Sequence, residues 1–332
     1  MLGYLIRRVL IMVPTLIAIS VVIFTIIHLP PGDYFSTYIA ELQSQGEGAN
    51  LAKIAFLKAQ YGFDKPLWQQ YLYWVVGLLQ GDMGYSFLYD LPVNKVVGDR
   101  LLLTFIVSFV TILFTYVVAF PIGVYSATHQ YSLADYGLTF LGFLGLATPS
   151  FLLALVLIYF SHVYFGISVG GLMDPIYLDK PWSWDKVVSV FAHIWIPVIV
   201  IGTAGTAAMI RRLRANLLDE LQKQYVVTAR AKGLHPAKVL FKYPLRLSLN
   251  PFISDIGSLL PHVISGAAVV SVVMSLPTTG PMLLEALRSQ DMFLAGSFLM
   301  FMAFLTVIGV FLSDLALAAL DPRIRLHAGR AE

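Results

Sequence analysis

The chain has 332 residues, of which 58% are hydrophobic and only 12% are charged, with a formal net charge of +3. A soluble domain holds about 25% charged residues, so this composition predicts a polytopic membrane protein. The absence of cysteine excludes disulfides, thiolate metal sites and cysteine nucleophiles. The small net charge gives no reason to expect a nucleic-acid partner.

Six stretches without Asp, Glu, Lys or Arg are long enough to cross a bilayer, which takes about 20 helical residues. Uninterrupted apolar runs predict helices rather than the alternating strands of a barrel. The first run follows Arg7 and Arg8 but is too long for a signal peptide, so we expect it to be retained as a span. The predicted spans are residues 9–32, 101–127, 137–163, 187–210, 256–284 and 292–313.

The connection after the first span is too long to be a plain loop, and we expect residues 33–100 to form a small helical insertion outside the membrane. Residues 49–62 and 66–81 are predicted to be short amphipathic helices, with Pro66 opening the second and Gly81 ending it. The Trp and Tyr residues of the second helix favour the headgroup level. The insertion either docks a partner or covers the first two spans.

The distribution of Lys and Arg predicts the orientation of the chain. Fourteen of them lie in the N-terminus, the 128–136 turn, the 211–255 segment and the C-terminal tail (321–332), and eight lie in the other connections. Because cytoplasmic loops carry the excess of Lys and Arg, both termini and the 211–255 segment should be cytoplasmic. The 211–255 segment supplies most of this bias.

Within that segment, residues 219–252 read "DELQKQYVVTARAKGLHPAKVLFKYPLRLSLNPF". Gly233 suits the end of a helix over 219–232, and Pro236 suits the first position of a second helix over 236–248. Topology alone accounts for basic residues in a cytoplasmic loop, but not for a helix, a turn and a helix. Such a protruding pair is suited to fit a groove on a soluble partner.

"YVVTARAKGL" and "LFKYPLRLSLNPF" resemble the coupling-loop motif of ABC importer permeases, in the variant of the dipeptide, oligopeptide and nickel importers. The resemblance extends along the chain through "YLIRRVL", "PPGD", "YGFDKPLWQQYLYWVVGLLQGDMGYSF", "TPSFLLALVLI" and "LDPRIRL". The chain departs from the general pattern in the coupling motif, as the peptide subfamily also does, and in the fifth span, where the departures concern the substrate rather than the mechanism. All the departures are Val227, Thr228 and Ala229 in place of Glu-Ala-Ala, Tyr243 to Arg246 in place of Ile-x-Leu-Pro, and Ser271, Thr278 and Thr279 in place of an acidic residue and a Pro-Gly-x-Gly turn.

The resemblance implies an all-α polytopic membrane protein with six transmembrane helices, an ABC importer type I-like core over residues 101–320, and a cytoplasmic coupling helix-turn-helix. It also implies a permease subunit that forms half of a path for oligopeptides in a bacterial or archaeal inner membrane. The implied partners are a second homologous permease, two ABC ATPase subunits and an external solute-binding protein. The implied coupling residues are Thr228, Ala229, Arg230, Gly233, Leu234, Pro236 and Leu240.

The sequence contains no phosphate-binding G-x-x-x-x-G-K-[ST] motif, so ATP and Mg²⁺ are expected on the partner ATPases and no cofactor on this chain. No catalytic or metal-binding residue is predicted. Relatives of such importers also carry oligosaccharides, which stays open as an alternative cargo.

A polar stripe on the fifth predicted span is a candidate for the translocation path. At 100° per residue, its members project within one arc of about 100°. Intramembrane ionisable residues usually have a function, although packing against polar groups of a neighbouring helix is the alternative. The stripe consists of Ser254, Asp255, Ser258, His262 and Ser265, and the last four are the candidates for lining the path.

Two other classes of function compete with this interpretation. An intramembrane serine hydrolase is suggested by "GISVG" around Ser168, with His193 and His262 in or near spans, but Ser168 lies in a glycine-rich external connection rather than in a strand-to-helix elbow. A secondary transporter or channel often has halves related by an inverted repeat, and the sequence has no matching halves.

Overall fold

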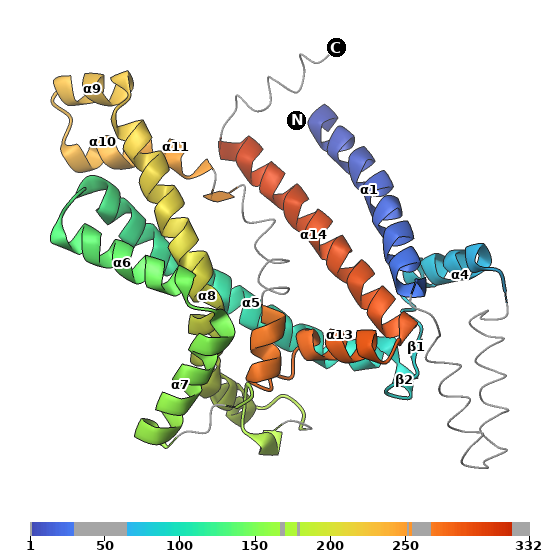
Figure 1. Cartoon of the computed structure of the whole chain (residues 1–332). Helices are drawn as coiled ribbons and strands as arrows, with labels where there is room; N and C mark the ends of the chain where they lie inside the picture. Colours follow the sequence, from blue (N-terminus) through green and yellow to red (C-terminus); the bar gives the residue numbers. More distant parts are fainter. Residues whose placement is uncertain are drawn as a thin grey trace. The chain divides into compact units, whose positions relative to one another are not determined.

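The computed structural model describes residues 2–29, 65–166, 170–177, 180–250, 252–253 and 267–320. In these residues the only sheet is one two-stranded hairpin, and the other regular elements are helices joined by turns and loops (Figure 1). It divides into two compact units, Met1–Leu103 with Thr278–Val307, and Thr104–Pro277 with Ile308–Glu332. Helices α5 (Val93–Thr128) and α14 (Met292–Leu320) each begin in the first unit and end in the second.

The first unit holds α1 (Leu2–His28), α4 (Leu67–Leu79), α13 (Thr279–Arg288) and the antiparallel hairpin of β1 (Tyr85–Ser86) and β2 (Leu91–Pro92). Apolar side chains at the start of α5 pack against α13 and the first turns of α14. Because β2 runs directly into α5, this packing also positions the hairpin. The core consists of Val93, Val96, Val97, Met282, Ala286, Leu294, Ala295 and Phe298.

Buried polar groups fasten the hairpin to α14. Asp291 is fully buried and accepts hydrogen bonds from the Ser86 hydroxyl (2.6 Å), the Leu88 amide and the Leu294 amide (both 3.1 Å). It therefore caps the N-terminus of α14 while it holds the hairpin. Burial raises the pKa of the Asp291 carboxyl, and these hydrogen bonds oppose that shift. We call residues 83–93 together with Asp291 the clasp.

The second unit is built around α8 (Trp184–Leu221), which contacts α6 (Leu133–Ala147), α7 (Ser150–Phe165) and α11 (Pro244–Ser248). It also holds α9 (Gln224–Ala231), α10 (Pro236–Lys242) and a 3₁₀ turn at Pro175–Tyr177, besides the later part of α5 and the end of α14. Small residues allow close helix contact: a Cβ at Gly145 would lie 2.5 Å from Thr203 Cγ2. Larger side chains there would force α6 away from α8.

Among the described residues, four helices are long and apolar enough to span a membrane, and they agree with the first, second, fourth and sixth predicted spans. They are Ile6–His28, Val93–Thr128, Trp184–Leu221 and Met292–Ala316. The fifth predicted span lies largely outside the described residues, although residues 267–273 are helical. The count of six is thus neither confirmed nor contradicted.

Several predicted boundaries are wrong. The third predicted span is not one straight helix, because α6 and α7 meet at 104° around Thr148 and Pro149. Proline lacks an amide hydrogen and disfavours the helical conformation of the residue before it. For the same reason Pro244 divides the predicted 236–248 helix into α10 and α11. The predicted 219–232 helix is also divided, since α8 continues to Leu221 and α9 begins at Gln224. The insertion helix predicted over 66–81 is confirmed as α4, while 49–62 lies outside the described residues.

Candidate coupling site

Helices α9 and α10, which we call the elbow (Gln224–Lys242), form a short helical hairpin after the end of α8 (Figure 1). The turn between them depends on Gly233, whose φ is +74°. The Gly233 amide donates to the Arg230 carbonyl (2.9 Å), and the Leu234 amide donates to the Ala229 carbonyl (3.4 Å). This is the Schellman pattern that closes helix C-termini. A Cβ at Gly233 would meet no atom within 4 Å, so the need for glycine is conformational rather than steric.

The elbow has a small core of its own. Val226 and Ala229 from α9 and Val239 from α10 are buried together, with Leu234 packed against them. Leu234 follows the left-handed glycine, the place where a Schellman turn brings an apolar side chain back to its helix. Of the predicted coupling residues, Ala229 and Leu234 therefore hold the elbow in shape rather than face a partner.

A second apolar cluster ties the elbow to long helices. Leu240 of α10 packs on a buried group formed by Ala127 of α5, Leu217 of α8 and Leu245 of α11. The Tyr225 hydroxyl also donates to Glu220, which links α9 to the last turn of α8. Burial and this hydrogen bond raise the pKa of the Tyr225 hydroxyl. The elbow is thus packed against α5 and linked to the last turn of α8.

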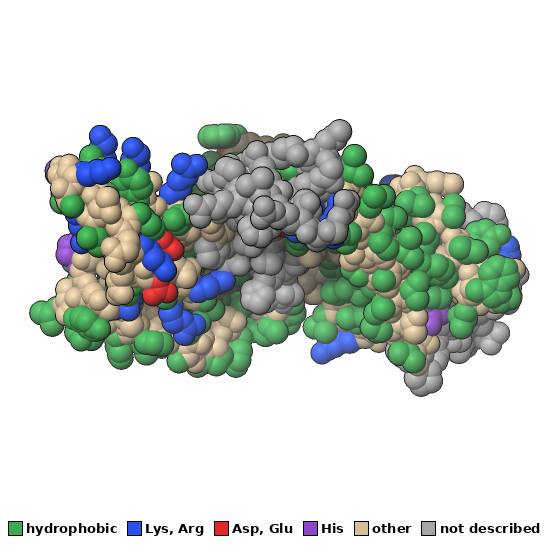
Figure 2. Space-filling model, turned by 90° about the horizontal axis from the view of Figure 1, so that it is seen from above, with side chains coloured by type: hydrophobic (Ala, Val, Ile, Leu, Met, Phe, Trp, Pro, Cys, Tyr) green, Lys and Arg blue, Asp and Glu red, His purple; other side chains and the backbone are tan. Residues whose placement is uncertain are grey.

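The outward face of the elbow is both basic and apolar. Figure 2 shows Lys and Arg side chains gathered at the left of the view, over the end of the second unit that carries α9 and α10. Two apolar side chains on the elbow stand in solvent, Val227 with 52% and Phe241 with 62% of its surface exposed. Exposed apolar groups rimmed by charge are typical of protein docking surfaces. The other predicted coupling residues, Thr228, Arg230, Gly233 and Pro236, are exposed as well.

Sequence reasoning did not identify Phe241 as a site residue. A large apolar side chain in a basic cytoplasmic segment was the available signal, but periodicity alone cannot decide whether it faces the elbow core or solvent. In the structure its neighbour Leu240 takes the inward position and Phe241 the outward one.

A salt bridge was also missed. Arg214 of α8 donates through Nε to Asp135 Oδ1 (3.1 Å) and through Nη2 to Asp135 Oδ2 (2.8 Å), and Asp135 is buried. The Ser132 hydroxyl accepts from the Asp135 amide, so α6 begins at Leu133, inside the predicted 128–136 turn. Ser132 is a residue type that favours the N-cap of a helix, so the sequence could have indicated this helix start. It could not indicate the pairing of Asp135 with Arg214, which are 79 positions apart.

The predicted path residues Asp255, Ser258, His262 and Ser265 lie outside the described residues, as does Ser168. His193, the other residue considered for a hydrolase, is buried in α8. Its Nδ1 lies 2.7 Å from the Ser189 carbonyl oxygen and its Nε2 lies 3.7 Å from Asp174 Oδ1. Within the described ranges, no cluster of three or more His, Cys, Asp or Glu could hold a metal ion.

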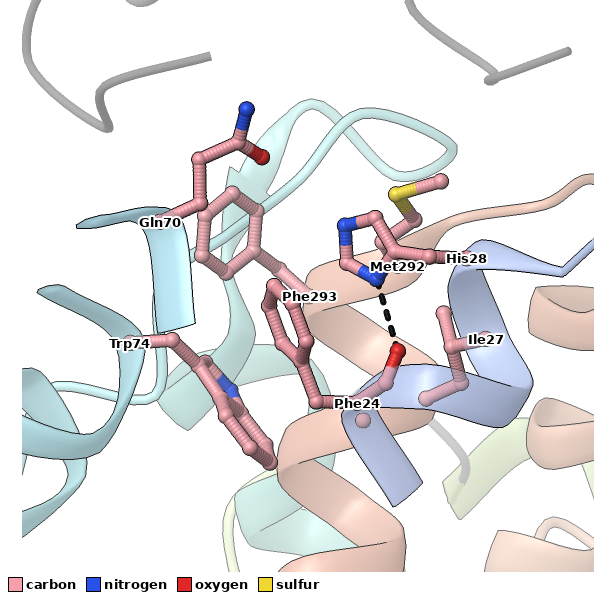
Figure 3. A pocket seen from close by; sticks show the side chains of 8 residues that line it. Phe24, Ile27, His28, Gln70, Trp74, Met292 and Phe293 are labelled. Atoms are coloured by element: carbon pink, nitrogen blue, oxygen red, sulfur yellow. Dashed lines mark hydrogen bonds between the residues drawn. The ribbon is translucent and has the colours of Figure 1, made fainter. Parts of the chain in front are cut away.

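One cavity of the first unit lies between α1, α4 and α14 (Figure 3). The rings of Phe24, Trp74 and Phe293 line it, and His28 Nδ1 lies 2.8 Å from the Phe24 carbonyl oxygen. Its volume of about 30 Å³ is enough for about one water molecule. It is therefore far too small to hold a transported solute.

Comparison with known proteins then decides the family. Residues 119–326 match the profile of the binding-protein-dependent transport system inner membrane component, and residues 1–108 match the N-terminal profile of the same kind of component. The chain belongs to this family. It is accordingly a multi-pass inner-membrane permease of the ABC importer type.

Three full-length relatives show how the family members are named. The chain is 33% identical to the oligopeptide transport system permease protein AppB of Bacillus subtilis, over 98% of this chain and 99% of that protein. It is 29% identical to the dipeptide transport system permease protein DppB of Escherichia coli K12, with the same coverage. It is 30% identical to the glutathione transport system permease protein GsiC of Pectobacterium atrosepticum, also over 98% and 99%.

A solved structure supports the fold. The described helices are similar to a chain of the MetNI methionine ABC transporter in an inward-facing conformation, with a TM-score of 0.52. The match covers 68% of this chain and 97% of that chain at 17% sequence identity. The all-α permease fold expected from the sequence is thereby confirmed.

Proposed function

We propose that this permease forms half of the translocation path for oligopeptides in an ATP-driven importer fed by an external solute-binding protein. Three relatives named for oligopeptide, dipeptide and glutathione transport all point to peptide cargo, whereas oligosaccharide transport has no support among them. The other half of the path would come from a second homologous permease.

The single observation that carries the coupling role is the construction of the elbow. Its core and Schellman turn keep α9 and α10 in one shape, its outer face offers Val227 and Phe241, and Leu240 joins it to α5 and α8. We propose that each of two ABC ATPase subunits, which bind ATP and Mg²⁺, docks one such elbow. Closure of the ATPase pair would then rock the attached spans between inward-open and outward-open states.

The orientation follows from the same proposal. Both termini and the elbow would be cytoplasmic, and α4 and the clasp external. Because the chain has no cysteine, single substitutions at the exposed Gln80 and Lys238 can test this. An impermeant maleimide should label Gln80→Cys in intact cells and Lys238→Cys only after permeabilisation. The reverse pattern would overturn the orientation.

The polar stripe at Asp255, Ser258, His262 and Ser265 would line the inner part of the path. Cysteines at positions 258, 262 and 265 should react with a small hydrophilic thiol reagent in the inward-open state, whereas cysteines at Leu260 and Ile264 should not. Equal reactivity on both faces would remove the stripe from the path.

Uptake in proteoliposomes that contain both permeases, both ATPases and the binding protein tests the function. We expect ATP-dependent accumulation of a radiolabelled oligopeptide and none of an oligosaccharide. Accumulation without ATP would favour a secondary transporter, and ATP-dependent accumulation of the oligosaccharide alone would replace the proposed cargo.

A further inference from the structure

A groove in the second unit runs between α6 and α8 and has a volume of about 220 Å³. Leu138, Thr139, Gly142 and Phe143 line it from α6. Gly142 has no side chain to fill the groove, and a Cβ there would lie 3.8 Å from Ala207 of α8, an ordinary contact distance. The floor is thus mostly apolar, although α8 also contributes two guanidinium groups.

These two guanidinium groups differ in their partners. Arg214 uses Nε and Nη2 for the buried Asp135, and its Nη1 takes no part in that pair. Arg211 is exposed, lines the same groove and pairs with no acid or other acceptor anywhere in the described ranges. Arg214 is paired with the Asp135 carboxylate, so among the described residues the positive charge of Arg211 in the groove is not compensated.

The charge pattern predicts that the arginines lie near the end of a membrane span. The charge-free stretch of α8 stops at Ile210, immediately before Arg211. The rings of Tyr131 and Tyr136 are 6.5 Å apart and 68% and 59% exposed, and they lie at the start of α6, on either side of the Asp135 that pairs with Arg214. Exposed Tyr rings mark the headgroup level of membrane proteins. From this level the groove continues along α6 toward the apolar middle of the helices.

We propose that this groove is a binding site for an anionic phospholipid, with its phosphate at Arg211 and Nη1 of Arg214 and one acyl chain against Gly142 and Phe143. Basic pockets between transmembrane helices are known to select anionic headgroups. The uncompensated guanidinium favours an anionic lipid, and a helix of the second permease is the competing occupant that the experiment below distinguishes. The proposal depends on the membrane location alone and not on the cargo or the ATPases.

Native mass spectrometry of the full-length permease, alone and in the assembled importer, can test this site. Phosphatidylglycerol and phosphatidylcholine with identical chains would be added at equal concentration after delipidation. The wild type should prefer phosphatidylglycerol. Arg211→Gln should lower the affinity for phosphatidylglycerol about fivefold, which is the effect of one basic residue near an anionic surface. The affinity for phosphatidylcholine should not change.

Two further variants separate the groove from general electrostatics. Arg212→Gln removes the same charge one position away, outside the groove lining, and should leave both lipid affinities unchanged. Gly142→Leu keeps both arginines but fills the groove, and it should lower the affinity for both lipids. Equal losses from Arg211→Gln and Arg212→Gln, no loss from Gly142→Leu, or displacement of the lipid when the second permease binds would each overturn the proposal.

Discussion

The clasp and the elbow are both short segments attached to long helices, yet they are held in opposite ways. In the clasp, one fully buried carboxylate receives hydrogen bonds from the hairpin and from the start of α14. In the elbow, three small apolar side chains form the core, and only backbone hydrogen bonds close the Schellman turn at Gly233. Buried hydrogen bonds are directional and costly to break, whereas apolar contacts are not directional. The clasp is therefore built to stay fixed, and the elbow to present a surface.

Among the predicted changes in stability, the largest is expected for the clasp in Asp291→Ala. It would leave the Ser86 hydroxyl and two backbone amides without their acceptor, at a cost of about 3 kcal/mol or more. Amide exchange of residues 83–93 should then accelerate by about two orders of magnitude. The exposed Glu285, which accepts a hydrogen bond from the Tyr89 hydroxyl (2.5 Å), offers a matched control, and Glu285→Ala should cost less than about 1 kcal/mol. Equal effects would refute the special role of the buried carboxylate.

The elbow should be most sensitive at its turn. In Gly233→Val, a β-branched residue must adopt a left-handed φ, which costs about 1–2 kcal/mol and opens the α9–α10 turn. ATP-driven uptake should be lost while the thermal unfolding of the rest of the permease changes little. Gly233→Asn, which tolerates this conformation, should retain most uptake. Normal uptake by the valine variant would remove the turn from the mechanism.

A smaller effect is expected where the elbow joins the spans. Leu240→Ala removes part of the cluster with Leu217 and Leu245, and because the side chain is only partly buried we expect a loss of about 1–2 kcal/mol. The elbow keeps its own core, so ATPase binding should persist while uptake per ATP hydrolysed falls. Leu247→Ala, the same change at an exposed leucine, is the control. Unchanged stoichiometry in Leu240→Ala would show that the cluster does not transmit force.

The smallest expected change is the pH dependence of the stability of the clasp. Burial raises the pKa of Asp291 in the folded clasp, so the folded state takes up its proton at a higher pH than the unfolded state does. The clasp should become more stable as pH falls from neutral through that raised pKa, with a slope no steeper than about 1.4 kcal/mol per pH unit. Asp291→Asn, which cannot titrate, should lack this slope. Amide exchange corrected for its intrinsic pH dependence would measure it, and an opposite slope would contradict the assignment.

The two regions also differ in how far the sequence predicts them. The elbow was predictable because its signals are local: Gly233 and Pro236 mark the end of one helix and the start of the next. The sequence did not predict that α8 ends at Gln222 before α9, or that α10 ends at Tyr243 before α11, because helix-forming composition continues through both points. The apolar runs likewise identified four of the six predicted spans but not the further extent of α8, since a helix does not end where charge begins.

The clasp was not predicted at all. Its strands have two residues each, too short for any alternating pattern, and Asp291 acquires its role from Ser86, 205 positions away. The pairing of Asp135 with Arg214 is non-local in the same way. Such contacts depend on the assembled fold, and composition and periodicity carry no information about them.

The central claim is that the outer face of the elbow is the docking surface for the ATPase, and cysteine protection at Phe241 tests it most directly. Phe241→Cys is the only thiol in this chain and stands in solvent. With a cysteine-free ATPase present at about ten times its Kd, about nine tenths of the permease is bound, so the reaction of this cysteine with a maleimide should slow about tenfold. Leu91→Cys, at an exposed position on the hairpin, should react at an unchanged rate. Equal reaction at Phe241→Cys with and without the ATPase would contradict the account.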